Sequence, residues 1–368
     1  MVEKKQTYCI FGQAFDQEGL RSFCLEKNSV PGTPVWEKEI WTFILKWLSP
    51  EESIEVNTSG STGKPKQISL QKKYMLESAK ATISFFGLKP GDSVLLCLPV
   101  KTIAGKMMIV RALVGGLDLQ YTSPSSKPHL DRFDKINFAA MTTMQVVNVL
   151  NAENGIQSIN KIEKLIVGGS GMPFGLEAKL QIVTSEIWQT YGMTETITHI
   201  ALRKVNGPNK TEWYNCLQGV SINSDERNCL AINYPKIGIE NLVTTDVVEF
   251  NKSGGFKIPG RIDHVVNSGG VKLFPEQIEK KLEGIIDSEF YISGIPDETL
   301  GERLVLIVEG NDLNEAEHSA FFDEIKTKLS GFEVPKKIIF QTTFKRTLSG
   351  KVIRDVTSAP VGIRTKRH

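Results

Sequence analysis

Between residues 33 and 200, the apolar positions alternate between helical spacing and short continuous runs. Thr33 and Pro34 form an N-cap followed by proline at the first helical position, and a broad apolar face continues to Trp47. The same reasoning predicts helices over 71–86, 103–114, 143–151 and 175–184, and strands over 93–98, 137–141, 164–167 and 187–190. Repeated alternation of apolar strands and helices predicts an α/β fold with a largely parallel sheet covered by helices.

The pattern changes near residue 200. Short, partly alternating segments at 228–234, 242–251 and 255–259 predict a small antiparallel β region. After Arg261, the spacing predicts helices over 276–284 and 315–330 and strands over 289–294, 303–309 and 337–341. These last elements would form a small α+β unit, so we expect an N-terminal domain over 1–261 and a C-terminal domain over 262–368.

Composition and charge exclude several function classes. The 368 residues exceed what one core usually organises, and 44 basic against 42 acidic side chains leave a formal charge of +2, which predicts no nucleic-acid partner. The longest apolar run, at 94–99, is too short to span a bilayer, and no apolar stretch follows the first residues, so we expect neither membrane insertion nor a secretory signal. Five scattered cysteines without a CxxC pair predict reduced thiols in a cytoplasmic protein.

The segment from Thr58 to Lys66 combines two glycines with hydroxyl and lysine side chains. Its glycines permit a tight turn, its hydroxyls can donate to anionic oxygens, and its lysines supply positive charge, a combination that suits phosphate groups. It is not a Walker A loop, because proline follows Lys64 and the GxxxxGK spacing is absent. On composition alone, a flexible polar loop is an equal alternative.

Three further motifs carry candidate chemistry, although each has a plainer interpretation by itself. The segment 190–196 follows a predicted strand, at the sheet edge where α/β proteins bind ligands, and offers an aromatic ring for a base and a carboxylate for Mg²⁺. Asp246 and Arg261 suit ribose hydroxyls. Lys351, on a glycine-containing loop, can reach a site on another domain as a point charge. The alternatives are a helix cap, surface ion pairs and a solvated basic loop.

In this order and at this spacing, the four motifs resemble the adenylate-forming superfamily of acyl-CoA synthetases, luciferases and peptide-synthetase adenylation domains. The similarity covers roughly residues 50–355. It implies an acid–thiol ligase that uses ATP, Mg²⁺ and coenzyme A to convert a small carboxylic acid into an acyl-adenylate and then a thioester. It also implies a C-terminal lid that rotates about a hinge at Asp263.

The resemblance assigns roles residue by residue. The loop expected around the β- and γ-phosphates of ATP contributes Thr58, Ser59, Gly60, Ser61, Thr62, Gly63 and Lys66. The expected adenine pocket consists of Tyr191 and Gly192 opposite Gly168, Gly169 and Ser170. The expected ligands of the α-phosphate and Mg²⁺ are Thr194 and Glu195, those of ribose are Asp246 and Arg261, and the catalytic lysine of the first half-reaction is Lys351.

Gly269 and Gly270, shortly after the hinge, match the family's glycine turn that lines the tunnel for the pantetheine thiol of coenzyme A. Glycine there permits close approach of the backbone to the thiol arm. The alternative is a simple hairpin turn, and we favour the tunnel because of its position after the hinge.

The acid substrate is suggested by a narrower resemblance. The segment 268–275 is similar to that of the o-succinylbenzoate–CoA ligases of menaquinone synthesis. Arg111, on the helix after Gly105, would suit the second carboxylate of that acid, because a guanidinium pairs bidentately with a carboxylate. A helix-surface salt bridge is an equal alternative for Arg111. Thr102 departs from the family, since it stands where many relatives carry a histidine that lines the acyl pocket.

Other functions stay open from the sequence. The alternatives are a ligase for another aryl or acyl acid, an enzyme that loads a separate carrier protein, and an inactive nucleotide-binding relative. The presence of Lys351, Glu195 and Asp246 argues against the inactive relative. A homodimer is the one assembly that we consider.

Overall fold

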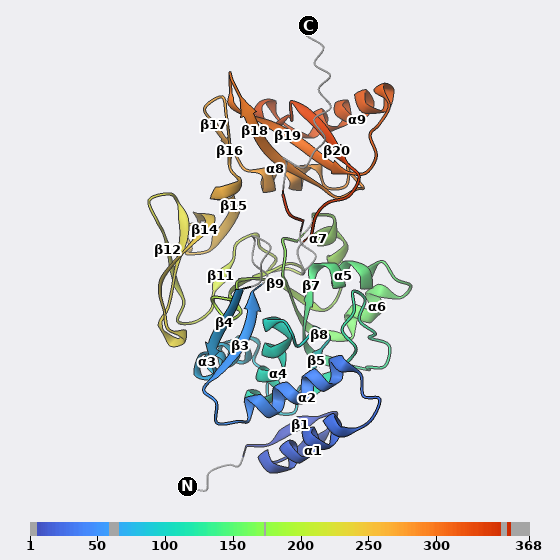
Figure 1. Ribbon diagram of the computed structural model, residues 1–368, viewed down its shortest axis with the longest axis vertical. Coiled ribbons are helices and arrows are strands. Elements are labelled where there is room, and N and C mark those ends of the chain that lie inside the picture. Colours follow the sequence, from blue (N-terminus) through green and yellow to red (C-terminus); the bar gives the residue numbers. More distant parts are fainter. Residues whose placement is uncertain (1–5, 59–65, 173, 347–351, 355–368) are drawn as a thin grey trace.

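The structure is a computed structural model that describes residues 6–58, 66–172, 174–346 and 352–354. Figure 1 shows a large lower part, which contains the principal sheet and the N-terminal helices, and a smaller upper part built from the C-terminal strands. None of the helices in these ranges has the length and apolar character needed to cross a bilayer. The five cysteines are free, as predicted.

The principal sheet of the described chain has nine strands, in the order β11-β10-β9-β8-β7-β5-β6-β1-β2. The pairs from β9 to β1 are parallel, and antiparallel strands flank them at both edges. The bounds are β1 (Tyr8–Ile10), β2 (Gln13–Phe15), β5 (Ser93–Leu96), β6 (Asp118–Tyr121), β7 (Ile136–Thr142), β8 (Ile162–Gly168), β9 (Glu186–Gly192), β10 (His199–Lys204) and β11 (Asn215–Cys216). This confirms the predicted, largely parallel α/β sheet.

Helices cover both faces of this sheet. Val94 and Leu96 of β5 belong to one hydrophobic cluster and Leu95 to another, because successive side chains of a strand point to opposite faces. Residues of α1–α4 join the first cluster and residues of α5–α7 the second. The helices are α1 (Gln17–Ser29), α2 (Val35–Trp47), α3 (Lys72–Phe86), α4 (Ile103–Gly115), α5 (Thr143–Leu150), α6 (Gly155–Asn160) and α7 (Phe174–Leu180). Burial on both faces explains the continuous apolar runs of the central strands.

Three local predictions need correction. Pro34 is itself the N-cap of α2, because the Thr33 hydroxyl donates to the Val30 and Lys27 carbonyls instead of capping the helix. Helix α7 ends at Leu180, earlier than predicted, because the Thr184 N–H donates to a side chain, Asn160 Oδ1, and not to a helical carbonyl. The spacing of apolar residues also does not predict the hairpin of β3 (Ser53–Thr58) and β4 (Lys66–Gln71). The two strands of this hairpin flank the predicted phosphate loop.

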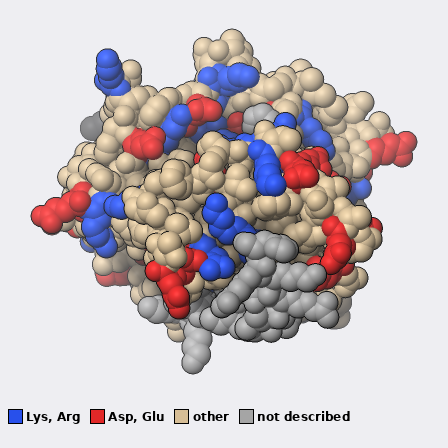
Figure 2. Space-filling model, turned by 90° about the horizontal axis from the view of Figure 1, so that it is seen from above, with Lys and Arg blue, Asp and Glu red and all other residues tan. Residues whose placement is uncertain are grey.

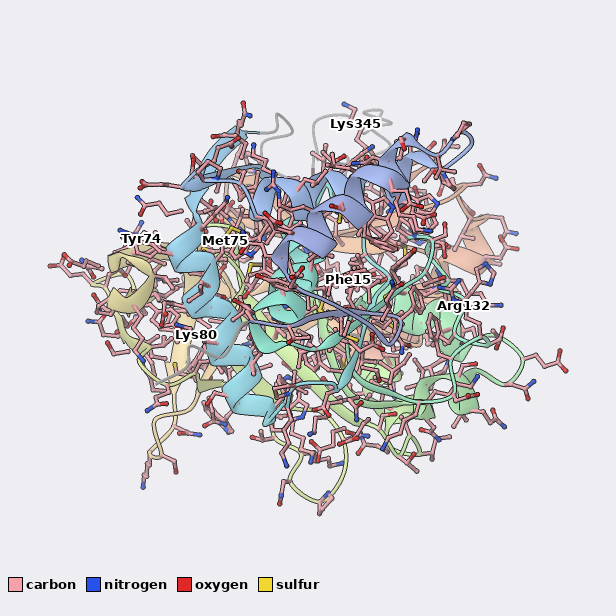
Figure 3. All side chains as sticks on the ribbon, turned by 90° about the horizontal axis from the view of Figure 1, so that it is seen from below. Phe15, Tyr74, Met75, Lys80, Arg132 and Lys345 are labelled. Atoms are coloured by element: carbon pink, nitrogen blue, oxygen red, sulfur yellow. The ribbon has the colours of Figure 1, made fainter. Side chains whose placement is uncertain are left out.

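A second sheet contains the predicted antiparallel strands. Its order is β12-β13-β14-β15, with bounds β12 (Ser221–Ser224), β13 (Cys229–Tyr234), β14 (Ile239–Phe250) and β15 (Phe256–Arg261). Between β13 and β14, the 3-10 helix η1 (Pro235–Ile237) packs on α3. A Cβ at Gly238 would lie 2.6 Å from the Tyr74 ring, so only glycine permits this approach. Figure 3 shows Tyr74 beside this turn.

The C-terminal sheet begins shortly after residue 262. Its strands are β16 (Val266–Ser268), β17 (Val271–Leu273), β18 (Phe290–Asp297), β19 (Gly301–Glu309) and β20 (Lys337–Gln341), accompanied by η2 (Ile262–His264), α8 (Pro275–Leu282), α9 (Glu315–Lys328) and η3 (Gly331–Glu333). The two hydrophobic clusters of this part contain residues from Val266 onward. Acidic and basic side chains are interspersed over the face seen in Figure 2.

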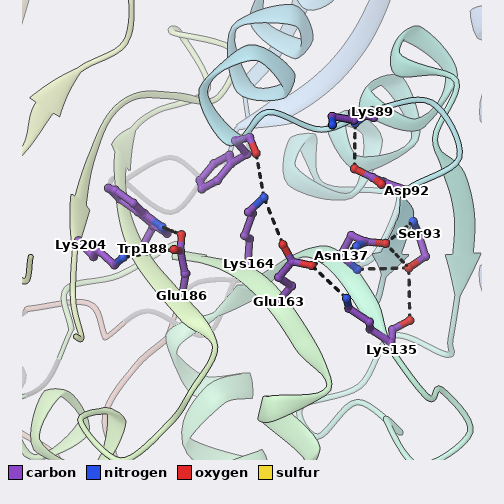
Figure 4. A network of polar contacts seen from close by, with 11 residues as sticks. Lys89, Asp92, Ser93, Lys135, Asn137, Glu163, Lys164, Glu186, Trp188 and Lys204 are labelled. Carbon is purple, nitrogen blue, oxygen red and sulfur yellow. Dashed lines mark hydrogen bonds and ion pairs between the residues drawn. The ribbon is translucent and has the colours of Figure 1, made fainter. Parts of the chain in front are cut away.

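At the amino ends of the central strands, charged side chains pair with one another. Lys164 Nζ donates to the Phe86 carbonyl at 3.0 Å and lies 3.4 Å from Glu163, which accepts from Asn137 and lies 3.4 Å from Lys135. Figure 4 shows this network, which lines a groove. The predicted site residues Gly168, Tyr191 and Gly192 lie at the opposite, carboxyl ends of β8 and β9.

Asn206, which is 3% exposed, joins α7 to the start of β9. Its amide donates to the Leu180, Val183 and Ser185 carbonyls, and its oxygen accepts from the Ile187 N–H at 3.0 Å. Asn206→Ala leaves these buried groups without their partner, so we expect the free energy of unfolding in urea to fall by about 2–3 kcal/mol. The exposed Asn209→Ala is the matched control. Equal stability of the two variants would contradict this role.

Candidate active site

The carboxyl ends of β8 and β9 form the centre of the predicted nucleotide site. Gly168 ends β8, and a Cβ there would lie 2.4 Å from Thr190 Oγ1, so glycine lets the two strand ends approach. Gly169 follows with φ of +92°, and Ser170 is exposed beside it. Tyr191, next to Thr190, therefore lies at the same edge, and the structure brings the two predicted halves of the adenine pocket together.

A tight loop after β9 presents Thr194 and Glu195. The Met193 N–H donates to Thr196 Oγ1 at 3.0 Å, and the Ile197 N–H donates to the Thr194 carbonyl at 2.9 Å. Ile197 has φ of +68°, a left-handed conformation that is strained for a β-branched residue. This folding leaves Glu195 exposed and Thr194 partly buried, so the Glu195 carboxylate is placed to meet a cation.

The Tyr191 hydroxyl donates to Asp246 Oδ2 at 2.5 Å, which joins β9 of the principal sheet to β14 of the second sheet. The Tyr191 ring also meets Phe256 edge-to-face, with 5.4 Å between the ring centroids. Burial raises the pKa of Tyr191, and the Asp246 carboxylate raises it further, so the phenol stays protonated and donates. The residues expected to contact adenine and ribose are thus in direct contact.

Asp246 and Arg261 oppose each other across the β14–β15 ladder. The Arg261 guanidinium donates two hydrogen bonds to Asp263, with Nη2 2.8 Å and Nε 3.0 Å from the carboxylate oxygens. This contact raises the pKa of Arg261 and lowers that of Asp263. Arg261 therefore links Asp246, its partner across the ladder, to the expected hinge residue, and sequence spacing does not show the contact across the ladder.

Arg111 is buried in the interior at 2% exposure. Its Nη2 donates to Thr198 Oγ1 at 3.3 Å and its Nη1 to Met108 Sδ at 3.5 Å, while Nε has no hydrogen-bond partner. Among the residues described, no carboxylate pairs with this guanidinium, so the alternative of a surface salt bridge is wrong. Burial lowers the pKa of Arg111 to about 9, which leaves it charged at neutral pH.

The hydroxyl and imidazole groups around Arg111 are functional candidates that the sequence reasoning missed. Ser78 Oγ lies 3.0 Å from Thr198 Oγ1, and Thr82 Oγ1 lies 3.3 Å from His199 Nε2. Burial, with the charge of Arg111, lowers the pKa of His199 well below its usual value. The sequence signal was the pair of hydroxyls four residues apart on the apolar face of α3.

Thr102 and Gly105 have evident structural roles at the start of α4. Thr102 is the N-cap, and its hydroxyl accepts from the Gly105 N–H at 3.2 Å. A Cβ at Gly105 would lie 2.2 Å from the Pro99 carbonyl oxygen, so glycine lets the helix approach the chain after β5. This first turn lies two turns before Arg111 on the same helix.

Other predicted residues lie wholly or partly outside the described chain. Thr58 and Lys66 oppose each other in the β3–β4 ladder, at the end where residues 59–65 connect the two strands. The predicted site residues that lie outside the described ranges are Ser59, Gly60, Ser61, Thr62, Gly63 and Lys351.

Gly269 and Gly270 form the two-residue turn between β16 and β17. Their φ values of +57° and +81° match a type I′ hairpin turn. The Gly269 N–H donates to the Leu300 carbonyl, and a Cβ at Gly270 would meet nothing within 4 Å. The hairpin is thus observed, and its outer side has room for another group beside the backbone of Gly270.

Comparisons with known proteins bear on the family to which the chain belongs. The family model "AMP-binding enzyme" matches residues 48–223. An AMP-forming acyl-CoA synthetase/AMP-acid ligase II-like protein from Dyadobacter fermentans has a solved structure that is 33% identical, with a TM-score of 0.62, over 91% of this chain and 96% of that chain.

Two more distant relatives have narrower names. The 2-succinylbenzoate–CoA ligase of Lactococcus lactis is 23% identical over 353 residues, which cover 89% of this chain and 76% of that protein. The o-succinylbenzoate coenzyme A synthetase of Bacillus subtilis, solved with ATP and magnesium ion, is 18% identical with a TM-score of 0.68, over 92% of this chain and 81% of that chain. At that identity, the second likeness concerns the fold.

His199 should make the protein sensitive to acid. The pKa of His199 in the folded state lies well below 6.5, the usual value for histidine. Below about pH 6.5, the unfolded state therefore binds a proton that the folded state does not. The free energy of unfolding then falls by up to about 1.4 kcal/mol for each unit by which the pH is lowered. We expect His199→Gln to lose less stability than the wild type between pH 7.5 and 5 in urea titrations. The exposed His129→Gln should keep the wild-type slope, and a matching slope in His199→Gln would refute the assignment.

Proposed function

The chain belongs to the AMP-binding enzymes and is an AMP-forming acid–CoA ligase, and from this premise we propose that its acid is 2-succinylbenzoate (o-succinylbenzoate). The proposal combines two kinds of support. One is the buried positive charge of Arg111 near the strand ends. The other is the similarity of the chain to 2-succinylbenzoate–CoA ligases such as that of Lactococcus lactis. An acid of this kind has one carboxylate to react and a second carboxylate to be recognised.

The observation that carries the proposal is the buried guanidinium of Arg111 without a carboxylate partner in the described chain. A buried unpaired charge is costly, and pairing with an opposite charge offsets that cost. A substrate with a second carboxylate supplies the missing partner, with Thr198 beside it. A monocarboxylic acid would leave Arg111 unpaired, which would favour the dicarboxylate.

The nucleotide side of the site fits ATP by its chemistry. An aromatic ring at Tyr191, the carboxylate of Asp246 and the guanidinium of Arg261 lie together at the strand ends, as base and ribose require. The exposed carboxylate of Glu195 is a suitable ligand for Mg²⁺, which would neutralise phosphate charge. The loop 58–66 would enclose the β- and γ-phosphates, and the Bacillus subtilis relative was solved with ATP and magnesium ion.

In the proposed first step, a carboxylate oxygen of the acid attacks the α-phosphorus of ATP. The new oxygen–phosphorus bond forms as the bond to pyrophosphate breaks, and the product is the acyl-adenylate. Both reactants are anions, so the residues act by positioning and charge neutralisation. Lys351 would bridge the carboxylate and the α-phosphate, and Thr194 would hold an α-phosphate oxygen.

In the proposed second step, the thiol of coenzyme A attacks the acyl carbon, AMP leaves and the thiol proton is released. Residues 262–368 would form a lid that rotates about Asp263 between the steps and withdraws Lys351. The open side of the Gly269–Gly270 turn would then line the passage of the pantetheine arm. We propose a cytoplasmic location, where coenzyme A and ATP are available.

The role of Arg111 can be tested by ATP–pyrophosphate exchange with 2-succinylbenzoate and with benzoate. Arg111→Met removes the charge, and we expect kcat/KM for 2-succinylbenzoate to fall about 10- to 100-fold, the worth of a charge-assisted hydrogen bond, with little change for benzoate. Loss of a buried unpaired charge should leave the Tm equal or higher.

The exposed Arg132→Met, labelled in Figure 3, is the control and should behave as wild type. An equal loss with both acids would contradict recognition of a second carboxylate. Equal activity of the wild type with 2-succinylbenzoate and with benzoate would contradict the proposed substrate.

Separate assays of the two half-reactions distinguish the proposed role of Lys351 from that of the glycine turn. Lys351→Ala should lose adenylate formation by more than about 100-fold, because charge stabilisation of the transition state is lost, and should keep the reaction of supplied acyl-adenylate with coenzyme A. Gly270→Asn, which tolerates φ of +81°, should do the reverse. Equal loss of both half-reactions in Lys351→Ala, or unimpaired thioester formation in Gly270→Asn, would argue against these roles.

A further inference from the structure

The two chain segments that flank residues 347–351 lie side by side. Arg346 and Val352 form an antiparallel β-bridge, and the Ile353 N–H donates to the Lys345 carbonyl at 2.8 Å. Lys351 comes directly before Val352 in the chain. The contacts that hold this bridge against the C-terminal sheet are therefore candidates for positioning the lysine.

Apolar side chains hold the bridge on one side. Phe344 is 6% exposed and belongs to a small cluster with Tyr291, Val305 and Ile307, and Val352 packs against the same cluster. Residues before and after the loop are thus seated on β18 and β19. Apolar packing of this kind fixes distance from the sheet but is not directional.

Arg346 adds directional contacts before the loop. Its Nη2 donates to Glu309 Oε2 at 2.8 Å, and its Nη1 donates to Glu289 Oε2 at 3.3 Å. The other oxygen of Glu309 accepts from the Phe344 N–H at 2.6 Å. One carboxylate at the end of β19 therefore holds both a side chain and the backbone of this segment.

Arg354 provides the corresponding contacts after the loop. Its Nη2 donates to Glu279 Oε2 at 2.7 Å, its Nη1 donates to the Ile292 carbonyl at 3.4 Å, and its guanidinium carbon lies 5.8 Å from the centroid of the Tyr291 ring. Glu279 Oε1 accepts from the Ile292 N–H at 2.8 Å, so backbone from β18 orients the carboxylate. The side chains of Arg354 and Glu279 are 25% and 15% exposed, so solvent screens the pair little.

A second carboxylate extends these contacts towards the hinge. Glu276, one turn before Glu279 on α8, has Oε1 3.9 Å from Arg354 Nη1 and 2.5 Å from His264 Nδ1. His264 follows Asp263 directly. The arginine after the loop is therefore connected through one helix to the residue after the expected hinge.

We propose that Arg354, held by Glu279, is a positioning residue that sets the place of Lys351 during adenylate formation. The inference rests on the proposed role of Lys351. Two residues separate Arg354 from Lys351 in the chain, so we expect a variant that releases Arg354 to change how the lysine is presented. All partners of Arg354 named above follow residue 262, so the contact would move with the lid and leave the second half-reaction unaffected. A displacement of about 1 Å from reacting geometry can cost about 100-fold in rate.

The test measures both half-reactions in Arg354→Met and Arg354→Lys. We expect Arg354→Met to lower kcat for adenylate formation about 10- to 100-fold, to leave KM for ATP and acid near the wild-type values, and to leave thioester formation from supplied acyl-adenylate unchanged. Arg354→Lys keeps a charge that can reach Glu279 and should recover part of the loss. Lys326→Met, which removes an exposed lid charge on α9, is the control and should match the wild type.

A double-mutant cycle separates positioning from general destabilisation. If Arg354 acts through Lys351, Arg354→Met causes no further loss of adenylate formation in the Lys351→Ala background. An additional loss there, or an equal loss of thioester formation, overturns the inference. If kcat is unchanged in Arg354→Met while Lys351→Ala strongly impairs adenylate formation, only the role of Arg354 is overturned. If Lys351→Ala is itself unimpaired, the proposed role of the lysine is overturned as well.

Discussion

The hydrogen bond from Tyr191 to Asp246 is the contact on which the proposed nucleotide site depends. It joins the carboxyl end of the principal sheet to the second sheet, and Asp246 in turn opposes Arg261, which pairs with Asp263. A ring for the base, groups for ribose and the expected hinge are therefore coupled through adjacent contacts. A shift between the two sheets would disturb all of them together.

Arg111 imposes a different constraint on the acid side. A fully buried guanidinium with hydroxyl and thioether neighbours, and no described carboxylate, is less stable than a paired one. Thr198 accepts a hydrogen bond from Arg111 and is itself within hydrogen-bond distance of Ser78, but a hydroxyl supplies no negative charge. This unpaired charge is the reason for the proposed second carboxylate of the acid. Thr198 lies three residues after Glu195, so one loop carries residues of both the proposed acid site and the proposed nucleotide site.

Ion pairs on the C-terminal sheet hold the chain segments that flank residues 347–351. Arg346 and Arg354 hold the chain on either side of residues 347–351, each through a carboxylate that also accepts a backbone N–H. Such shared acceptors limit the freedom of the arginines, because moving either one disturbs a strand.

Most helices and strands, and the order of the motifs, could be predicted from the sequence. Spacing predicted a helix over 71–86 and strands over 164–167 and 187–190, which the structure shows as α3 and as parts of β8 and β9, because helix period and apolar strand runs are local properties of a chain. Only the tertiary structure decided that Arg111 is buried rather than on a helix surface, that Tyr191 contacts Asp246, and that Arg354 meets Glu279. These partners are 55 and 75 residues apart in the latter two pairs. Their meeting depends on how sheets and helices pack, which local spacing does not encode.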